Sequence, residues 1–336
     1  MPGFKATAKQ HTIIVLESAT IGLPSELDLP GSEYKIIEYP HTSGDQVAER
    51  IKAATILVIA ATRLDFHLLS HRVSPNLEMI SLVASGTDTV DLEACRKRGI
   101  RVCNASGASA AAVSEHALGF YFAVRRHFVK THSIVQAGGW KGRSTLNHMM
   151  MGTMEKMPLN CEEETMGLIG NGTIGKRIAK LARMLGMKVL ISDRKGEGTC
   201  RPGRTLFEDV LKNSTVLILV IPRTPESTNM ISTGELKMMR KEAVLVNVSR
   251  GEIVDEVALV QALKHGWIGG AAVDVFAHEP ATSETCPLIG DHAKDLNLIT
   301  TPHTAWAGDQ TSANLQRMAK ENIEAWYCGE PRRIVA

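Results

Sequence analysis

Three side chains suited to acid–base and anion-binding chemistry follow three successive apolar runs in the second half of the chain. Arg250, Glu279 and His303 each stand one to four residues beyond the end of such a run. An arginine presents a planar fork that binds a carboxylate and polarises a carbonyl beside it. A histidine can give a proton to a developing alkoxide, and a neighbouring carboxylate favours the imidazolium and orients the ring. Together these groups suit the reduction of a carbonyl next to a carboxylate.

Each of these residues also has a structural explanation when taken alone. Arg250 could form a surface ion pair, Glu279 could begin a turn, and His303 could be a satisfied loop histidine. An ordinary histidine has a pKa of about 6.5, so it is a weak acid at neutral pH without a carboxylate partner. The occurrence of all three at the ends of parallel strands favours one shared site.

A glycine-rich turn follows an earlier apolar run. The sequence G-N-G-T-I-G leads into a helix expected over Thr173–Leu185. Its glycines allow a tight turn, close approach of the backbone to a pyrophosphate, and close packing of helix on strand. The helix N-terminus then offers free N–H groups to the phosphates. The three glycines are Gly170, Gly172 and Gly175.

The next apolar run ends in Asp193, 18 residues beyond Gly175. A carboxylate at this point accepts hydrogen bonds from the adenosine ribose and repels a 2′-phosphate. The basic neighbours Arg194 and Lys195 could receive such a phosphate, which keeps NADP as an alternative. Because Asp193 stands at the strand end itself, the sequence favours NAD.

The elements that must position these groups are two sets of parallel strands. The pattern of short β-branched runs separated by helical segments predicts an α/β fold with two doubly wound parallel sheets. Strands are expected in the first third at Thr12–Leu16, Tyr34–Ile37, Ile56–Ala61, Met79–Val83 and Arg101–Cys103. In the second half they are expected at Met166–Gly170, Lys188–Asp193, Val216–Ile221, Val244–Ser249, Gly269–Val275 and Asn297–Thr301. The second set describes a Rossmann dinucleotide domain, with ligands beyond the carboxyl ends of its strands.

The length also predicts two domains, at about 150 residues each. We expect the dinucleotide domain over 116–301 and a discontinuous substrate domain from 1–115 plus 302–336. A long helix at Ala111–His127 would bridge the two domains, and a final helix around Thr311–Trp326 would pack back on the N-terminal domain. The methionine-rich stretch Gly138–Glu164 has no clear period. It is interpreted as a surface loop or an interface insertion, with the loop favoured.

Composition excludes several classes of protein. The 336 residues include 38 Lys and Arg against 36 Asp and Glu, a formal net charge of +2. This balance lacks the basic footprint of a nucleic-acid-coating protein. No apolar run approaches the roughly 20 residues that span a bilayer, and no signal-peptide pattern is present. Six scattered cysteines without a C-x-x-C pair predict reduced thiols, no metal site and a cytoplasmic location.

Two further groups of residues leave alternatives open. Ser85 and Gly86 end an apolar run, where backbone N–H groups could hold a carboxylate. An ordinary strand-to-helix turn capped by Thr87 or Asp88 explains the same residues equally well. His67 and His71 stand four apart and could face one metal ion, but without a third ligand a pair on a helix surface is favoured.

Seven stretches of this chain resemble the D-isomer-specific 2-hydroxyacid dehydrogenase family. They appear in the family's order and are spread over Ser85–Trp306. They read SGTDTVD (Ser85–Asp91), VCNASG (Val102–Gly107), GLIGNGTIG (Gly167–Gly175), SDR (Ser192–Arg194), NVSRGEIVDE (Asn247–Glu256), AAVDVFAHEP (Ala271–Pro280) and TPHTAW (Thr301–Trp306).

The resemblance implies a flavodoxin-like substrate domain and a homodimer formed through the dinucleotide domain. By position, Arg250 would anchor the substrate, Glu279 would orient the histidine, and His303 would be the acid–base. Ser85 and Gly86 would contact the substrate carboxylate. Cofactor contacts would come from Thr173, Ile174, Asp193, Ile221, Pro222, Ser227, Val248, Ser249 and Asp274.

These inferences lead to one functional hypothesis and one alternative. The hypothesis is an NAD-dependent reductase that moves hydride to C2 of a small 2-oxo acid. Trp306, which we expect at the substrate site, makes the last motif similar to that of glycerate dehydrogenases, so hydroxypyruvate or glyoxylate is favoured. The same turn also resembles corepressors that use this fold as NADH-sensitive scaffolds. The intact Arg250, Glu279 and His303 favour the enzyme.

Overall fold

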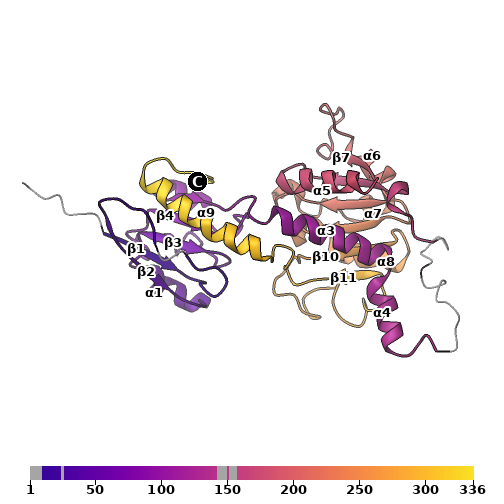
Figure 1. The fold of residues 1–336 in the computed structure, drawn as a ribbon, viewed down its shortest axis with the longest axis horizontal. Helices are drawn as coiled ribbons and strands as arrows, with labels where there is room; N and C mark the ends of the chain where they lie inside the picture. The colour runs from indigo at the N-terminus through magenta and orange to yellow at the C-terminus, as the bar shows by residue number, and fades with distance from the viewer. Residues whose placement is uncertain (1–9, 24–25, 142–149, 151–156) are drawn as a thin grey trace, which may run out of the picture. The chain divides into compact units, whose positions relative to one another are not determined.

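The chain folds into two compact units, shown in Figure 1. The structure is a computed structural model that describes residues 10–23, 26–141, 150 and 157–336. One unit joins residues 1–109 to 307–336, and the other comprises 110–306. In each unit the sheet is built from strands that pair in parallel. This confirms the predicted α/β class with two doubly wound sheets.

The smaller unit has the strand order of flavodoxin. Among its described residues the sheet has the order β2-β1-β3-β4-β5. Helix α9 packs against β4, and Ile334 pairs antiparallel with Cys103 of β5. The C-terminal segment of the chain is therefore part of this unit. The elements are β1 (Gln10–Val15), β2 (Glu33–Glu38), η1 (Gly44–Gln46), α1 (Val47–Ile51), β3 (Ile56–Ile59), β4 (Met79–Leu82), α2 (Leu92–Arg98), β5 (Arg101–Cys103) and α9 (Asp309–Tyr327).

The larger unit is a Rossmann domain. Its described strands have the order β11-β10-β9-β8-β6-β7, so the chain adds β7 on one side of β6 and the later strands on the other. The point between β6 and β8 is the switch point where such sheets bind ligands. The strands are β6 (Thr165–Ile169), β7 (Lys188–Ile191), β8 (Val216–Leu219), β9 (Val244–Asn247), β10 (Gly270–Val273) and β11 (Leu298–Thr300). The helices are α3 (Ala110–Arg125), α4 (Phe128–Gln136), η3 (Cys161–Glu163), α5 (Thr173–Met184), α6 (Phe207–Asn213), η4 (Pro225–Ser227), α7 (Thr233–Met238), η5 (Gly251–Ile253) and α8 (Glu256–Lys264).

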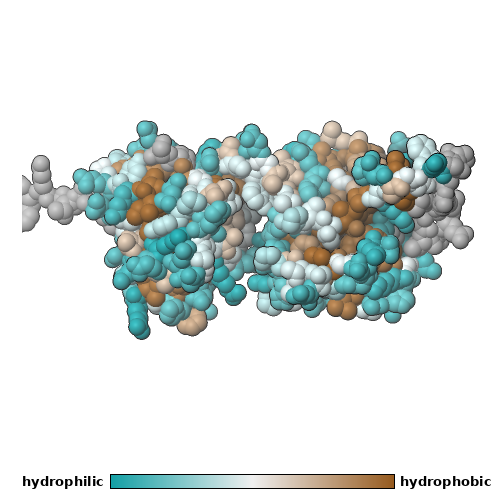
Figure 2. All heavy atoms as spheres, turned by 90° about the horizontal axis from the view of Figure 1, so that it is seen from below, coloured by the Kyte–Doolittle hydropathy of each residue, from teal (hydrophilic) through white to brown (hydrophobic). Residues whose placement is uncertain are grey.

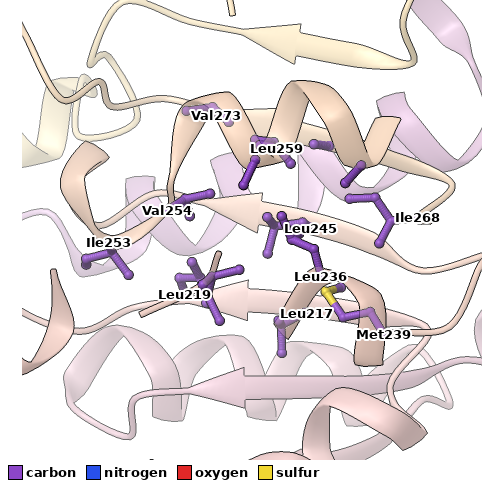
Figure 3. Packing of buried hydrophobic residues seen from close by; sticks show 14 of the residues in the cluster. Leu217, Leu219, Leu236, Met239, Leu245, Ile253, Val254, Leu259, Ile268 and Val273 are labelled. Carbon is purple, nitrogen blue, oxygen red and sulfur yellow. The ribbon is translucent and has the colours of Figure 1, made fainter. Parts of the chain in front are cut away.

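Both faces of this sheet are covered, which explains the continuously apolar strands. Successive side chains of a strand point to opposite faces. In β8, Leu217 and Leu219 join the core beneath α6, α7 and α8, whereas Val216 and Ile218 join the core beneath α3 and α5. The first core, which includes Leu217 and Leu219, is shown in Figure 3.

Four strands of the larger unit end two residues earlier than the sequence predicts. They are β7, β8, β9 and β10, whose observed last residues are Ile191, Leu219, Asn247 and Val273. Beyond these ends the regular strand pairing stops, and the backbone amides bond in other ways. Ser249, for example, donates its amide to the Asn247 side chain at 3.1 Å. The apolar pattern continues past each strand because most of these residues are buried and the two that follow β8 are partly buried, so the pattern overestimates strand length.

The unit boundaries also have a physical cause. The sequence placed them at 115/116 and 301/302, and the structure divides the chain after Ser109 and after Trp306. Helix α3 begins at Ala110 and packs its first turns on the Rossmann sheet. Ala305 and Trp306 pack on the same core.

Three expectations concern the remaining chain. Most of the methionine-rich stretch, 142–149 and 151–156, lies outside the described residues. Within the part of the chain that the structure describes, no helix is long and apolar enough to cross a membrane. The six cysteine thiols, all in described positions, are unpaired.

Candidate active site

The glycine turn between β6 and α5 is closed by two contacts that exclude a side chain. Gly170 has φ +114°, and a Cβ added there would lie 2.2 Å from the Val220 carbonyl oxygen. A Cβ on Gly175 would lie 2.4 Å from the Gly170 carbonyl oxygen. Gly172, the N-cap of α5, faces open space instead. The backbone therefore closes under the turn and leaves the helix N-terminus accessible, which fits the pyrophosphate of a dinucleotide.

Asp193 lies two residues beyond β7 with its carboxylate almost completely buried. The Arg201 side chain donates from Nε at 2.9 Å and from Nη2, and the Arg201 and Arg194 amides donate at 2.8 and 2.9 Å. These hydrogen bonds, with the Arg201 side chain foremost, hold the pKa of the Asp193 carboxyl well below its usual range. The predicted ribose acceptor is thus present, and Arg201 occupies it.

The other predicted cofactor residues line the carboxyl ends of the same sheet. Thr173 is exposed on the first turn of α5, and Ile174 packs partly on the core. The Ser227 hydroxyl donates to the Pro222 carbonyl at 3.1 Å, and the Ser249 hydroxyl donates to the Leu219 carbonyl at 2.5 Å. The Ser227 hydroxyl therefore stabilises its own turn, whereas the Ser249 hydroxyl ties the turn after β9 to the end of the neighbouring strand β8. The residues that follow β8 and β9 at this edge are Ile221, Pro222, Val248 and Ser249.

The turn after β9 presents Arg250 and depends on the glycine that follows it. A Cβ on Gly251 would lie 1.9 Å from the Phe276 carbonyl carbon, so this turn presses directly against the turn after β10. Arg250 Nη1 donates to the Ser249 carbonyl at 2.6 Å, and Asn247 Nδ2 donates to the Arg250 carbonyl at 2.9 Å. The close approach of the two turns brings Arg250 towards the Glu279 segment.

Glu279 and His303 form a direct pair. His303 Nδ1 lies 2.7 Å from Glu279 Oε2, and Glu279 Oε1 accepts the Phe276 amide at 2.9 Å. Partial burial opposes ionisation of Glu279, but the bonds from His303 and Phe276 and the charges of His303 and Arg250 outweigh it and lower the pKa of this carboxyl. Glu279 is therefore an anion that fixes one imidazole nitrogen. His303 holds φ at +53°, a left-handed backbone.

Asp274 holds the turn that carries His303. Its Oδ1 accepts the Thr304 amide and its Oδ2 accepts the Ala305 amide, both at 2.9 Å. The Asp274 carbonyl accepts the His303 amide at 2.7 Å. The Thr301 hydroxyl also donates to Oδ1. The carboxylate that the resemblance implies as a cofactor contact is thus engaged by its own chain.

Edge residues of one parallel sheet therefore supply three chemical functions. They are a guanidinium for a carboxylate, a histidine for proton transfer, and a carboxylate that orients the histidine. The glycine turn and the buried acid at Asp193 belong to the same edge, as expected for a dinucleotide site. This combination suits hydride transfer to or from a 2-hydroxy acid.

Comparison with known proteins identifies the family of this chain. Residues 118–305 match the family model described as D-isomer specific 2-hydroxyacid dehydrogenase, NAD binding domain. A glycerate dehydrogenase from Methylorubrum extorquens is 37% identical over 308 residues, which cover 90% of this chain and 92% of that protein. The chain belongs to the D-isomer-specific 2-hydroxyacid dehydrogenase family. It is therefore a 2-hydroxyacid oxidoreductase with a nicotinamide cofactor.

Two further proteins extend the comparison. A glyoxylate reductase from Thermococcus litoralis is 34% identical over 287 residues, covering 84% of this chain and 83% of that protein. The NADPH-dependent glyoxylate/hydroxypyruvate reductase of Sinorhizobium meliloti, solved with NADP and malonate, has a TM-score of 0.78 at 24% identity and covers 98% of this chain and 97% of its own. The second likeness shows that the two chains share a fold.

The residues predicted to contact the substrate lie in different units of this dehydrogenase. Trp306 follows the His303 turn and packs on the Rossmann core. Ser85 and Gly86 belong to the smaller unit, where the Ser85 carbonyl accepts Asn104 Nδ2 at 2.9 Å. The cap of the next helix is neither Thr87 nor Asp88. It is Asp91, whose side chain accepts the Ala94 amide at 2.9 Å, because the helix begins only at Leu92.

The prediction that His67 and His71 lie on the surface of a helix is wrong. Both residues lie in consecutive turns, and Arg98 Nη2 lies 3.4 Å from His71 Nδ1. In the described ranges, no cluster of three or more His, Cys, Asp or Glu residues could hold a metal ion.

Two residues near the family's motifs were not singled out from the sequence. Arg201 lies in a loop without periodicity, and its only signal is a positive charge eight residues after Asp193. His116 Nε2 lies 3.2 Å from the Thr301 hydroxyl. Since that hydroxyl gives its hydrogen to Asp274, His116 must donate to it. His116 therefore adds a second support beneath the His303 turn.

Proposed function

We propose that this oxidoreductase reduces small 2-oxo acids to D-2-hydroxy acids, with hydroxypyruvate or glyoxylate preferred and NADH as the preferred cofactor. The observation that carries the proposal is the 2.7 Å contact between His303 and Glu279 beside the Arg250 turn. These residues stand at the carboxyl end of the sheet that also bears the glycine turn. The named relatives, a glycerate dehydrogenase and a glyoxylate reductase, support the substrate class.

The proposed chemistry divides between three residues. Arg250 binds the substrate carboxylate through its fork and polarises the adjacent C2 carbonyl. The bound nicotinamide supplies the hydride. His303 gives its Nε2 proton to the oxygen of C2, so one hydride and one proton convert the carbonyl to a hydroxyl. Glu279 holds Nδ1 and stabilises the imidazolium before the transfer.

The proposed cofactor contacts follow from the shape of the sheet edge. The glycine turn and the first turn of α5, with Thr173 and Ile174, receive the pyrophosphate. Asp193 accepts the ribose hydroxyls, which supports NAD over NADP. Ile221, Pro222, Ser227, Val248 and Ser249 border the cofactor along β8 and β9. A contact of Asp274 with the carboxamide, and of Ser85, Gly86 and Trp306 with substrate, remain predictions.

A panel of 2-oxo acids tests this proposal. Oxidation of NADH and NADPH is followed at neutral pH with hydroxypyruvate, glyoxylate, pyruvate, 2-oxobutyrate and a branched 2-oxo acid. We expect the highest kcat/KM for hydroxypyruvate or glyoxylate and a D-configured product from hydroxypyruvate. A preference for the branched acid would overturn the substrate assignment. If NADH binds and no 2-oxo acid is reduced, the NADH-sensing scaffold becomes the better account.

We also propose a homodimer formed through the larger unit. Helix α4 buries none of its residues, and Phe128, Val129 and Trp140 are each more than half exposed. Other apolar side chains also reach the surface of this unit in Figure 2. A second copy that covers α4 would remove this apolar area from water. Light scattering should give twice the mass of one chain, and the double variant Phe128→Ser with Val129→Ser should shift the measured mass towards that of one chain.

We place the enzyme in the cytosol, since its six cysteines form no disulfide bond.

A further inference from the structure

The loop after β7 closes a cationic side chain onto the predicted ribose acceptor. Arg201 lies eight residues beyond Asp193 and donates to both of its carboxylate oxygens. The Asp193 side chain is 3% exposed, whereas that of Arg201 is 57% exposed. The acid is thus fixed in the protein, and its partner reaches in from the solvent side.

This pairing changes what the acid offers to a ribose. A carboxylate has about four acceptor positions. The Arg194 amide, the Arg201 amide and the Arg201 Nε and Nη2 groups supply four donors to Asp193. A ribose hydroxyl can donate to Asp193 only if the guanidinium gives up its place. NADH binding therefore competes with Arg201.

The same pairing changes what the site offers to a 2′-phosphate. An isolated carboxylate repels a phosphate, but the charge of Asp193 is compensated by Arg201. A guanidinium has five N–H donors, and the bonds to Asp193 use two of them. The other three remain available to a phosphate, for which arginine is well suited.

The space beside the pair is large enough for such a group. A cavity of about 240 Å³ is lined by Asp193, Arg194, Glu197, Thr199, Cys200 and Arg201. One water takes roughly 30 Å³ of liquid. Its lining carries two arginines, Arg194 and Arg201, and two acids, Asp193 and Glu197, so the charges balance. Lys195 does not contribute, because it pairs with Glu235 at 2.8 Å and donates to the Met230 carbonyl.

We propose that Arg201 determines cofactor specificity: it is displaced from Asp193 by the ribose of NADH and retained to bind the 2′-phosphate of NADPH. The site then accepts both cofactors, and Arg201 sets how far NADH is preferred. This inference rests on the proposed use of a nicotinamide cofactor and deepens it.

Arg201→Ala tests the proposal in the full chain, with Arg204→Ala as the matched control. Arg204 lies on the same loop and donates to the Ser192 carbonyl at 3.2 Å. Calorimetric titration at fixed ionic strength gives Kd for NADH and NADPH, and for the adenosine probes AMP and 2′,5′-ADP. In Arg201→Ala, Kd for NADPH and 2′,5′-ADP should rise about tenfold, whereas Kd for NADH should fall two- to fivefold. Arg204→Ala should leave the ratio of the Kd values for NADH and NADPH unchanged.

Opposite shifts for the two ligands distinguish specificity from structural support, because a distorted loop weakens both. Arg201→Lys keeps the charge without the fork and should give an intermediate ratio. Equal shifts for NADH and NADPH, or none, in a folded Arg201→Ala variant would overturn this inference and leave the proposed function intact. If the wild-type chain binds neither nucleotide, the proposed cofactor falls and this inference with it.

Discussion

Asp193 and Asp274 are two buried acids at the carboxyl edge of one sheet, and they are held in different ways. As whole residues, Asp193 is 6% exposed and Asp274 is 1% exposed. Both carboxylates accept several hydrogen bonds. At Asp193 the strongest partner is the side chain of Arg201. At Asp274 the partners are the amides of Thr304 and Ala305 and the Thr301 hydroxyl.

This difference in hydrogen-bond partners determines which of the two acids can exchange its partner for a ligand. A solvent-exposed arginine can rotate away without disturbing the fold. The amides of a packed turn can leave only if the turn opens, which exposes donors that must be satisfied. Asp193 is therefore suited to ligand exchange. Asp274 is a positioning residue that keeps His303 against Glu279.

The largest effect is expected at Asp274. Asp274→Ala removes the acceptors of the Thr304 and Ala305 amides, and the free energy of unfolding should fall by about 2–4 kcal/mol. The loosened turn displaces His303, and kcat should fall by on the order of 10²-fold. Chemical denaturation measures the loss of stability, and steady-state rates measure the loss of kcat. A stable variant with wild-type kcat would contradict a positioning role.

A smaller and pH-dependent effect is expected at Glu279. Its lowered pKa keeps it ionised well below neutral pH, so its charge stabilises the imidazolium throughout the working range. Glu279→Gln removes that charge, so the protonated ring of His303 loses its anionic partner. The alkaline limb of the rate of 2-oxo acid reduction should move to lower pH, with a loss of about tenfold at pH 8. A parallel loss at every pH would indicate a steric effect instead.

The smallest effect on turnover is expected at Asp193. Asp193→Ala removes the ribose acceptor and leaves Arg201 for a 2′-phosphate, so the gap between NADH and NADPH should narrow about tenfold. At saturating cofactor kcat should hold, unlike in Asp274→Ala. Paired KM measurements with both cofactors check this. An unchanged gap would mean that the ribose contact is assigned to the wrong residue.

The same two acids show how far the sequence could predict the site. The apolar runs predict where the strands end. The sequence therefore predicts Asp193, Arg250, Glu279 and His303 at the carboxyl edge of one sheet. The partners of the acids could not be predicted, because Arg201 and Thr304 lie in segments without a repeating pattern. Their contacts depend on loop geometry and on close approaches such as that of Gly251 to Phe276.

Comparing the reduction of hydroxypyruvate by NADH in the wild-type and His303→Ala enzymes tests whether His303 is the acid of the reaction. We expect the wild-type enzyme to reduce hydroxypyruvate, and we expect kcat to be at least 10²-fold lower in the variant. The Kd for NADH should be the same in both, because His303 acts on the substrate oxygen. Equal kcat values in the two proteins would contradict the proposed acid and move the chemistry to another residue.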